Sequence, residues 1–376
     1  KSWKSISSNL PERTLVWRIV QDHIMKDLFF AATEFGIYFS VNSGREWVPL
    51  KGNVPTISFR DLAIQRREND LIGASFGRGI FVLDDYSVLR EVSDQELAKE
   101  AKLFPTRKAW WYFQRPHLSF SGLRGSQGAS HYVAPNPPFG AVFTYHLKEG
   151  YKSSKEARQE KEQKMAEAGQ DISFPGWDAI EAEAREQATK IWLVVEHEDA
   201  GVIRRLQGPT GKGFHRVAWD LRYPDYRTIK LKDLDKKEED APKAGLLASP
   251  GTYTVSLYKE VAGRLTQLSG PQPFEVVPLH QGTLKGADIQ EVAGFWRSFE
   301  TANRQHSRLS TVLKKSMTKF KGLEKAIAHS RKGFMDFNAQ LYDLTGNFQS
   351  LNFQLNGSSL RTQVGEKNQP TISDYL

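Results

Sequence analysis

Few residues of this sequence have the types and spacing that chemistry requires. Residues 208–213 read Gly-Pro-Thr-Gly-Lys-Gly, but a phosphate loop needs an earlier glycine and a Ser or Thr where Gly213 stands. The histidines lack the H-E-x-x-H spacing of a zinc site, and His197 lies between Glu196 and Glu198 at a predicted strand end. The sequence therefore predicts a hairpin turn at 208–213, no metal site and no cofactor.

A second candidate is a scattered group of charged residues in the N-terminal quarter. It comprises Arg18, Glu34, Arg60, Arg78 and Asp85. Arginines bind carboxylates, while hydrolysis of an acidic sugar also needs a nucleophile with an acidic partner and a separate acid. Arg78, Glu34 and Asp85 are the candidate binding residues if they face one channel. Their spacing assigns no catalytic role, and exposed loop positions are the simpler explanation.

Two other patterns also have structural explanations. The aromatic run at 110–113, Trp-Trp-Tyr-Phe, would bind sugar by stacking, yet in a strand beside another domain it would form interdomain core. A basic cluster lies opposite an apolar helical seam, where charge is expected, so we predict no nucleic-acid partner. It comprises Lys314, Lys315, Lys319, Lys321, Lys325, Arg331 and Lys332.

The charged candidates would be positioned by short strands that repeat at a fixed offset. Asp27-Leu28 recurs as Asp70-Leu71, and Gly36-Ile37 recurs as Gly79-Ile80 at the same distance. A period of roughly 40 to 50 residues with several short strands is typical of β-propeller blades, which need neighbours to cover their faces. We predict that residues 1–95 form the last two or so blades, in separate sheets. The expected strands are 15–20, 28–32, 36–41, 47–50, 61–65, 71–75, 79–83 and 88–92.

One turn in the first repeat carries a recognisable motif, Ser40-Val41-Asn42-Ser43-Gly44-Arg45-Glu46-Trp47. The Asn42 side chain would cap its own turn, Gly44 would supply a left-handed backbone, and Trp47 would pack under the hairpin. The motif resembles the Asp-box (BNR) repeat, Ser-x-Asp-x-Gly-x-x-Trp, of sialidase-like and sortilin-like propellers. In that family the box is structural and lies away from the ligand face. Trp3 is expected to end an earlier box, so further blades are expected before it.

The resemblance extends along the chain in short phrases. Residues 77–85, Gly-Arg-Gly-Ile-Phe-Val-Leu-Asp-Asp, resemble the closing strand of the last blade in bacterial sortilin-like repeat proteins, which are often labelled glycosyl hydrolases. Segments 103–105, 136–141, 219–222 and 249–253 are similar to the downstream part of the same group. The resemblance implies an architecture more than an activity.

The rest of the chain changes character twice. Alternating strands over 96–280 predict an Ig-like or fibronectin-like sandwich, interrupted by a helical insertion at 152–187 and a charged loop at 230–246. Residues 287–355 then show apolar spacings of three and four, which predict an antiparallel helical hairpin zipped along one seam, followed by a polar tail at 356–376. The fold class is therefore mainly β with an α-helical C-terminal part.

Composition limits the function classes. The chain has 376 residues, no cysteine and a formal net charge of +8, so disulfides and a Cys nucleophile are excluded. A mild positive charge is weak evidence for an anionic partner, and no apolar run reaches the ~20 residues of a membrane span. The resemblance places such a chain outside the cytoplasm, in the periplasm, on the cell surface or secreted.

Three functions are consistent with these observations. The favoured hypothesis is a non-catalytic extracytoplasmic protein whose propeller binds a protein or glycan within a larger complex. The alternative is a glycoside hydrolase of sialidase type, with its catalytic residues mostly in blades that precede Lys1. The third is a scaffold subunit whose main contact is the helical hairpin at 287–355.

Overall fold

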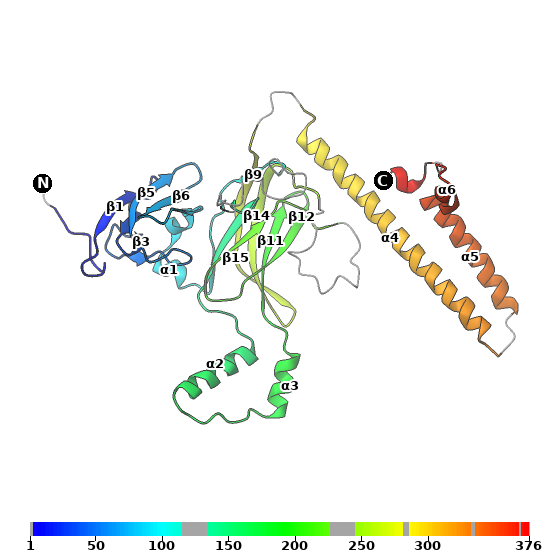
Figure 1. The fold of residues 1–376 in the computed structure, drawn as a ribbon, viewed down its shortest axis with the longest axis horizontal. Coiled ribbons are helices and arrows are strands. Elements are labelled where there is room, and N and C mark those ends of the chain that lie inside the picture. Colours follow the sequence, from blue (N-terminus) through cyan, green and yellow to red (C-terminus); the bar gives the residue numbers. More distant parts are fainter. Residues whose placement is uncertain are drawn as a thin grey trace. The chain divides into compact units, whose positions relative to one another are not determined.

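The computed structural model describes residues 3–114, 134, 136–225, 245–280, 286–331, 335–367 and 370–375. Contacts divide the chain into two compact units. Unit 1 comprises Lys1–Leu221 and Pro250–His280, and unit 2 comprises Arg222–Ser249 and Gln281–Leu376. Unit 1 contains the sheets, and unit 2 contains the long C-terminal helices (Figure 1). Most of the predicted loop at 230–246 lies outside the described residues.

The N-terminal part of unit 1 forms two separate antiparallel sheets, each with its strands in chain order. The first contains β1 (Val16–Gln21), β2 (Phe29–Thr33), β3 (Gly36–Ser40) and β4 (Val48–Pro49). The second contains β5 (Phe59–Gln65), β6 (Asp70–Ser75) and β7 (Ile80–Leu83). The two repeats therefore lie in different sheets, as predicted. They share a buried core of Leu28, Phe30, Ala32, Ile37, Phe59, Leu62, Leu71 and Tyr86.

The predicted strand at 88–92 is wrong, because Ser87–Glu91 forms a 3₁₀ helix, η1. Asp85 has a left-handed φ of 44°, and its carboxylate accepts hydrogen bonds from the backbone N–H and the hydroxyl of Ser87. This local turn redirects the chain before a fourth strand can pair with β7. The second sheet consequently has three strands.

The second part of unit 1 consists of two further sheets. One has the order β13-β10-β8, and the other has the order β12-β11-β14-β15-β9. Their bounds are β8 (Ala101–Leu103), β9 (Ala109–Trp111), β10 (Ala141–Leu147), β11 (Lys190–His197), β12 (Gly201–Gly208), β13 (Gly213–Trp219), β14 (Gly251–Val261) and β15 (Arg264–Pro278). Aromatic side chains join the two sheets face to face, with ring centroids 5.3 Å apart for Phe143 and Phe274 and 5.4 Å apart for Trp219 and Tyr253.

Short helices complete unit 1. They are α1 (Asp94–Leu97), α2 (Ser154–Glu167) and α3 (Trp177–Arg185), and the last two lie within the predicted helical insertion. Ser153 and Glu156 form a capping box that starts α2. The Arg158 guanidinium then joins α2 to α3 through two hydrogen bonds to Glu183, at 2.7 and 2.8 Å. The insertion is thus a small helix pair with its own ion pairs.

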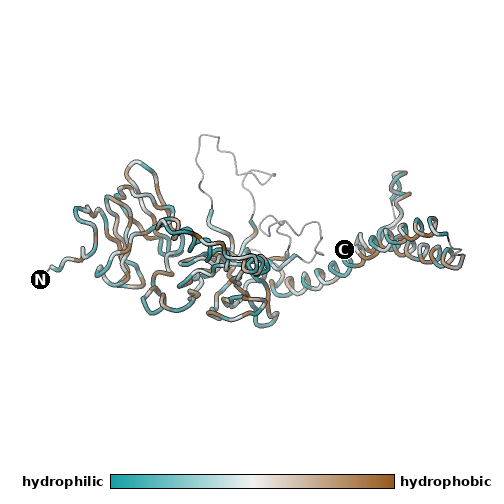
Figure 2. The backbone as a smooth tube through the Cα atoms, turned by 90° about the horizontal axis from the view of Figure 1, so that it is seen from below, coloured by the Kyte–Doolittle hydropathy of each residue, from teal (hydrophilic) through white to brown (hydrophobic). Residues whose placement is uncertain are grey.

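Unit 2 is built on α4 (Ile289–Ala328) and α5 (Met335–Asn356), followed by α6 (Ser359–Gln363) and α7 (Ile372–Tyr375). Figure 2 shows apolar and hydrophilic residues alternating along the two long helices. The two long helices lie in the region, 287–355, expected for a helical hairpin. Phe320 and Phe348 meet with ring centroids 4.9 Å apart, and Leu313 and Leu341 are buried, whereas Leu323 and Leu344 are about half exposed. No described helix has the length and apolar character of a membrane span.

Candidate functional site

An arginine without a polar partner marks one end of the two N-terminal sheets. The guanidinium carbon of Arg60 lies 3.6 Å from the ring centroid of Trp17 and 4.8 Å from that of Phe76. Its Nε atom is buried and has no hydrogen-bond partner among the described residues. Cation–π contacts of this kind fix the direction of a guanidinium while leaving its N–H donors available. The two rings therefore hold the Arg60 guanidinium in place, and its Nε donor is left unsatisfied.

Glu34 and Ser58 complete this group, which we call the Arg60 cluster (Trp17, Glu34, Ser58, Arg60 and Phe76). The Glu34 carboxylate accepts hydrogen bonds from the Trp17 indole N–H at 2.9 Å and from the Ser58 hydroxyl at 3.2 Å. The backbone N–H of Phe76 donates to the Ser58 carbonyl at 2.9 Å. These bonds connect the start of β1, the β2–β3 turn, the start of β5 and the end of β6.

The neighbouring acidic residue does not neutralise Arg60. Asp61 follows it on β5 and pairs with Arg18 at 3.4 Å. Arg60 itself lies where the pairing of β5 with β6 shifts register, between Phe59 and Asp61. Phe76 and the nearby Phe35 are 71% and 53% exposed, so the Arg60 cluster is bordered by accessible aromatic rings. Exposed aromatic rings beside a half-buried arginine are typical of binding surfaces.

The Asp-box-like turn folds as its residue types predict. The Ser40 hydroxyl accepts a hydrogen bond from the Gly44 N–H and donates one to the Asn42 amide oxygen, both at 2.9 Å. Gly44 has a φ of 77°, and a Cβ added there would lie 2.9 Å from the Cβ of Ile6. Trp47 is 2% exposed, and its indole N–H donates to the Ile6 carbonyl at 2.7 Å. The turn therefore holds the N-terminal segment by packing and hydrogen bonds.

The Asp-box-like turn and the Arg60 cluster lie at opposite ends of the first sheet. In the β2–β3 pair, Thr33 faces Gly36 near Glu34, while Phe29 faces Ser40 at the other end. Trp3 is fully exposed, so it lacks the packing that Trp47 has, and its place in an earlier box stays a prediction.

A buried ionic network also lies at the Asp-box end. The Asp22 carboxylate accepts hydrogen bonds from Arg90 at 2.8 and 2.9 Å, from the Tyr86 hydroxyl at 2.6 Å and from the Met25 N–H at 2.7 Å. Burial alone would raise the pKa of Asp22, but the hydrogen bonds from Arg90, Met25 and Tyr86 outweigh it and hold that pKa well below its ordinary value. Burial and the bond to Asp22 raise the pKa of Tyr86. The network joins β1 to η1 and is structural.

The structure does not bring Arg78, Glu34 and Asp85 together. Arg78 is exposed in the β6–β7 turn, at the end of the sheets where Glu34 lies. Asp85 follows the far end of β7, where its N–H donates to the Asp70 carboxylate at 2.9 Å. The three residues cannot form one site within these two sheets, because the length of the β6–β7 hairpin separates Asp85 from the others.

Asp85 instead belongs to a junction with the second part of unit 1. Arg216 on β13 donates to the backbone carbonyl of Asp84 at 2.7 Å and to that of Asp85 at 2.5 Å. The Glu68 carboxylate accepts hydrogen bonds from Arg107 at 2.9 Å and from the Trp110 indole at 3.1 Å. Trp110 therefore contacts the β5–β6 turn, whereas Phe113 of the same aromatic run is 67% exposed.

The remaining chemical candidates have ordinary structural roles. Gly208 ends β12 and Gly213 begins β13, but these strands lie in different sheets. Residues 208–213 therefore connect the two sheets, and the prediction of a hairpin turn is wrong. Lys212 in this connection is exposed and pairs with Glu149 at 3.3 Å. Within the described parts of the chain, no group of three or more His, Asp or Glu side chains is arranged to hold a metal ion.

Sequence reasoning named Arg18, Glu34 and Arg60 but missed Trp17, Ser58 and Phe76. The signal that points to Phe76 is an aromatic residue directly before the Gly77-Arg78-Gly79 turn, where burial is not expected. Trp17 is harder to find, because an aromatic residue in a strand is usually read as core. Its indole reaches Glu34 across the pairing of β1 with β2, which spacing alone does not show.

Comparisons with known proteins do not assign the chain to a family. No protein-family model matches the chain, and no curated protein matches it. One similar solved structure is described as the extracellular domain of a one component system from B. thetaiotaomicron, with 9% sequence identity and a TM-score of 0.16. The alignment covers 70% of this chain and 25% of that chain, so this chain spans about a quarter of its length.

Proposed function

We propose that the protein is a non-catalytic binding protein that acts outside the cytoplasm, and that the Arg60 cluster is part of its ligand surface. In this proposal the two N-terminal sheets are terminal blades of a sortilin-like Asp-box propeller. The two following sheets are an Ig-like sandwich that supports them. The ligand is a protein or glycan, and the chain is a subunit of a larger complex.

The blade arrangement is supported by the topology of the two sheets. Each is an antiparallel meander in chain order, and their first strands, β1 and β5, carry the Arg18–Asp61 pair that joins them. The strand next to a propeller channel is the first of each blade, so β1 and β5 would line the channel. The Arg60 cluster would then lie at one mouth of that channel, and the Asp-box turn on the other side.

The single observation that carries the binding role is the unpartnered guanidinium of Arg60. A half-buried arginine normally has a carboxylate or carbonyl partner, because leaving its donors unsatisfied is unfavourable. Arg60 has neither, and Trp17 and Phe76 hold it in place. A ligand carboxylate would accept hydrogen bonds from the terminal N–H groups of the guanidinium, and the exposed rings would contact its apolar or sugar parts. We therefore propose that the ligand presents a carboxylate.

The proposal is tested by binding of the whole chain to two carboxylate probes, an oligogalacturonate and an Asp/Glu-rich peptide, measured by calorimetry. We expect one probe to bind, and Arg60→Ala to weaken its binding by about 10-fold or more, as is typical when a charged hydrogen-bond partner is lost. Arg66→Ala is the matched control, because Arg66 is exposed in the β5–β6 turn at the other end of the sheet.

Three outcomes would contradict the proposal. The first is an Arg60→Ala variant that binds the probe as tightly as the wild type. The second is failure of both probes to bind. The third is steady turnover of aryl-glycosides by the whole chain that is lost in Glu34→Gln, which would favour the glycoside hydrolase alternative.

A further inference from the structure

The Arg60 cluster contains a carboxylate as well as a guanidinium, and neither group is fully satisfied inside the fold. Trp17 and Ser58 both donate to the same Glu34 oxygen, Oε2, at 2.9 and 3.2 Å. The other oxygen, Oε1, has no hydrogen-bond partner among the described residues and is not a buried atom. The terminal nitrogens of Arg60 are likewise unpartnered there, and only its Nε is buried. Two opposite charges with free hydrogen-bonding capacity thus lie in one cluster.

The indole of Trp17 sets the distance between these two charges. The Arg60 guanidinium lies against the face of the ring, with its carbon 3.6 Å from the centroid. The Glu34 carboxylate lies at the ring edge, with Oε2 2.9 Å from the indole nitrogen. Because face and edge directions are perpendicular, the guanidinium carbon and this oxygen are roughly 5 to 7 Å apart, beyond hydrogen-bond reach. Trp17 therefore keeps Arg60 and Glu34 as neighbours that do not pair directly.

A ligand that is only an anion suits this arrangement poorly. Arg60 attracts a carboxylate, but Glu34 repels it, and the two side chains together carry no net charge. The charged side chains next to them, Arg18 and Asp61, pair with each other at 3.4 Å. A ligand that carries an ammonium beside its carboxylate would instead meet each of the two groups with an opposite charge.

The dimensions fit an ammonium and a carboxylate attached to one carbon atom. The carboxylate would accept hydrogen bonds of about 2.8 Å from the terminal N–H groups of Arg60, and the ammonium would donate one of similar length to Glu34. A bent bridge of this kind spans the gap that Trp17 maintains. The exposed rings of Phe35 and Phe76 border the cluster and would contact the side chain of the ligand.

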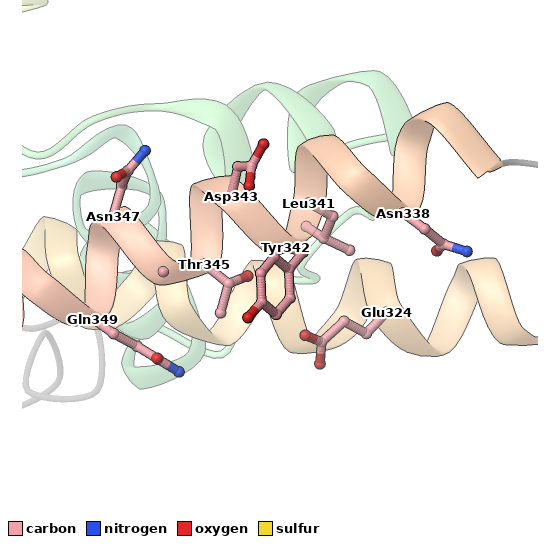
Figure 3. Close-up of a pocket in the computed structure, with 9 residues that line it drawn as sticks. Glu324, Asn338, Leu341, Tyr342, Asp343, Thr345, Asn347 and Gln349 are labelled. Carbon is pink, nitrogen blue, oxygen red and sulfur yellow. The ribbon is translucent and has the colours of Figure 1, made fainter.

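The groove beside the two long helices of unit 2 lacks this combination of charges. Figure 3 shows that Glu324 of α4 and Tyr342 and Asp343 of α5 border this groove. Glu324 and Asp343 are the charged groups among its described lining residues, and both are acidic. The groove therefore offers no pair of opposite charges to a ligand, whereas the Arg60 cluster does.

We propose that the Arg60 cluster binds a zwitterionic group, in which Arg60 binds a carboxylate and Glu34 binds an ammonium on the adjacent carbon, as in an α-amino acid. The inference rests on the proposed function, since it requires the carboxylate that Arg60 binds there. It narrows the ligand from carboxylates in general to those with a neighbouring positive charge. Glu34 is then the residue that sets this specificity.

The test compares phenylalanine with N-acetylphenylalanine as probes of the whole chain, by calorimetric titration. Both probes carry the same ring and carboxylate, but acetylation removes the positive charge. We expect the wild type to bind phenylalanine about 10-fold or more tightly than N-acetylphenylalanine, as is typical for a charged hydrogen bond. Arg60→Ala should weaken the binding of both probes, because both present the carboxylate.

Glu34→Gln tests the role of the carboxylate directly. The amide oxygen of glutamine still accepts from Trp17 and Ser58, but the negative charge is gone. This variant should bind phenylalanine about 10-fold more weakly and N-acetylphenylalanine no more weakly than the wild type does. Glu46→Gln is the matched control, because Glu46 is exposed in the Asp-box-like turn at the other end of the first sheet, and it should leave both affinities unchanged.

The outcomes separate this inference from the proposed function. Equal affinity of the wild type for the two probes would overturn the inference, and so would equal weakening of both probes by Glu34→Gln, which is the result if Glu34 only positions Trp17. If neither probe binds while the oligogalacturonate or the acidic peptide does, the inference fails and carboxylate binding by Arg60 stands. If none of the four probes binds, both proposals fail.

Discussion

Two arginines of unit 1 differ sharply in how the protein surrounds them. The Arg90 side chain is 15% exposed and donates to Asp22 and to the Asn69 amide oxygen. Arg60 contacts two aromatic rings and has no polar partner among the described residues. Arg90 therefore has the acceptors it needs inside the fold, whereas Arg60 has none among the described residues.

The comparison shows that the two ends of one pair of sheets serve different purposes. The end that holds the Asp22 network and the Asp-box-like turn is closed by hydrogen bonds and burial. The end that holds the Arg60 cluster exposes Phe35 and Phe76 and leaves a charge unpaired. Substitutions at the first end should change stability, and substitutions at the second should change binding.

The largest effect is expected from Asp22→Ala. It leaves Arg90 buried without its carboxylate, and the free energy of unfolding should fall by about 3–5 kcal/mol, as for other broken buried pairs. Urea denaturation followed by tryptophan fluorescence measures this change. Asp61→Ala removes the partner of the exposed Arg18 and serves as the control, with an expected change of about 0–1 kcal/mol. Equal losses of unfolding free energy in Asp22→Ala and Asp61→Ala would contradict the distinction between a buried and an exposed ion pair.

The same network predicts how stability depends on pH. The pKa of Asp22 is lower in the folded protein than in the unfolded chain, so the unfolded chain takes up a proton first as the pH falls. The stabilisation is complete above an ordinary carboxyl pKa of about 4 and is lost as the pH falls below it. Unfolding free energies measured from pH 7 to pH 2 should decrease less steeply in Asp22→Asn than in the wild type. If the unfolding free energies of the two proteins fell equally with pH, Asp22 would not be the cause of the pH dependence.

A smaller effect is expected at the Asp-box-like turn. Gly44→Ala forces an alanine into a left-handed backbone and against Ile6, so we expect a loss of about 1–3 kcal/mol in unfolding free energy. Gly77 has a similar φ of 73° but no atom within 4 Å of an added Cβ, so Gly77→Ala isolates the backbone contribution. We expect Gly44→Ala to lower the melting temperature more than Gly77→Ala, because only Gly44→Ala also places a Cβ against Ile6. A larger decrease in Gly77→Ala would show that Ile6 does not pack on the turn.

The smallest change in stability is expected from Arg60→Ala. Removing the side chain loses two cation–π contacts at a half-exposed site, worth about 0.5–1 kcal/mol each, and also removes an unsatisfied donor, which partly offsets the loss. The net change in unfolding free energy should therefore be under about 1 kcal/mol. A loss comparable to that of Asp22→Ala would mean that Arg60 is structural.

Local patterns in the sequence predict much of the fold but little of the site. The strands of the two repeats follow from alternation and turn residues, and the helices follow from apolar spacing. The strand expected at 88–92 fails because the turn at Asp85 and the pairing of Arg90 with Asp22 hold those residues in a 3₁₀ helix. The stacking of Arg60 on Trp17 and Phe76 joins residues of different strands, and residue spacing does not show such contacts.

The measurement that tests the account most directly is a comparison of Arg60→Ala with the wild type in one preparation, by urea denaturation and by calorimetric titration with the carboxylate probe. The account predicts an unfolding free energy within about 1 kcal/mol of the wild type and a dissociation constant raised about 10-fold or more. Unchanged affinity together with a large loss of stability would contradict it, because Arg60 would then serve the fold and not the ligand.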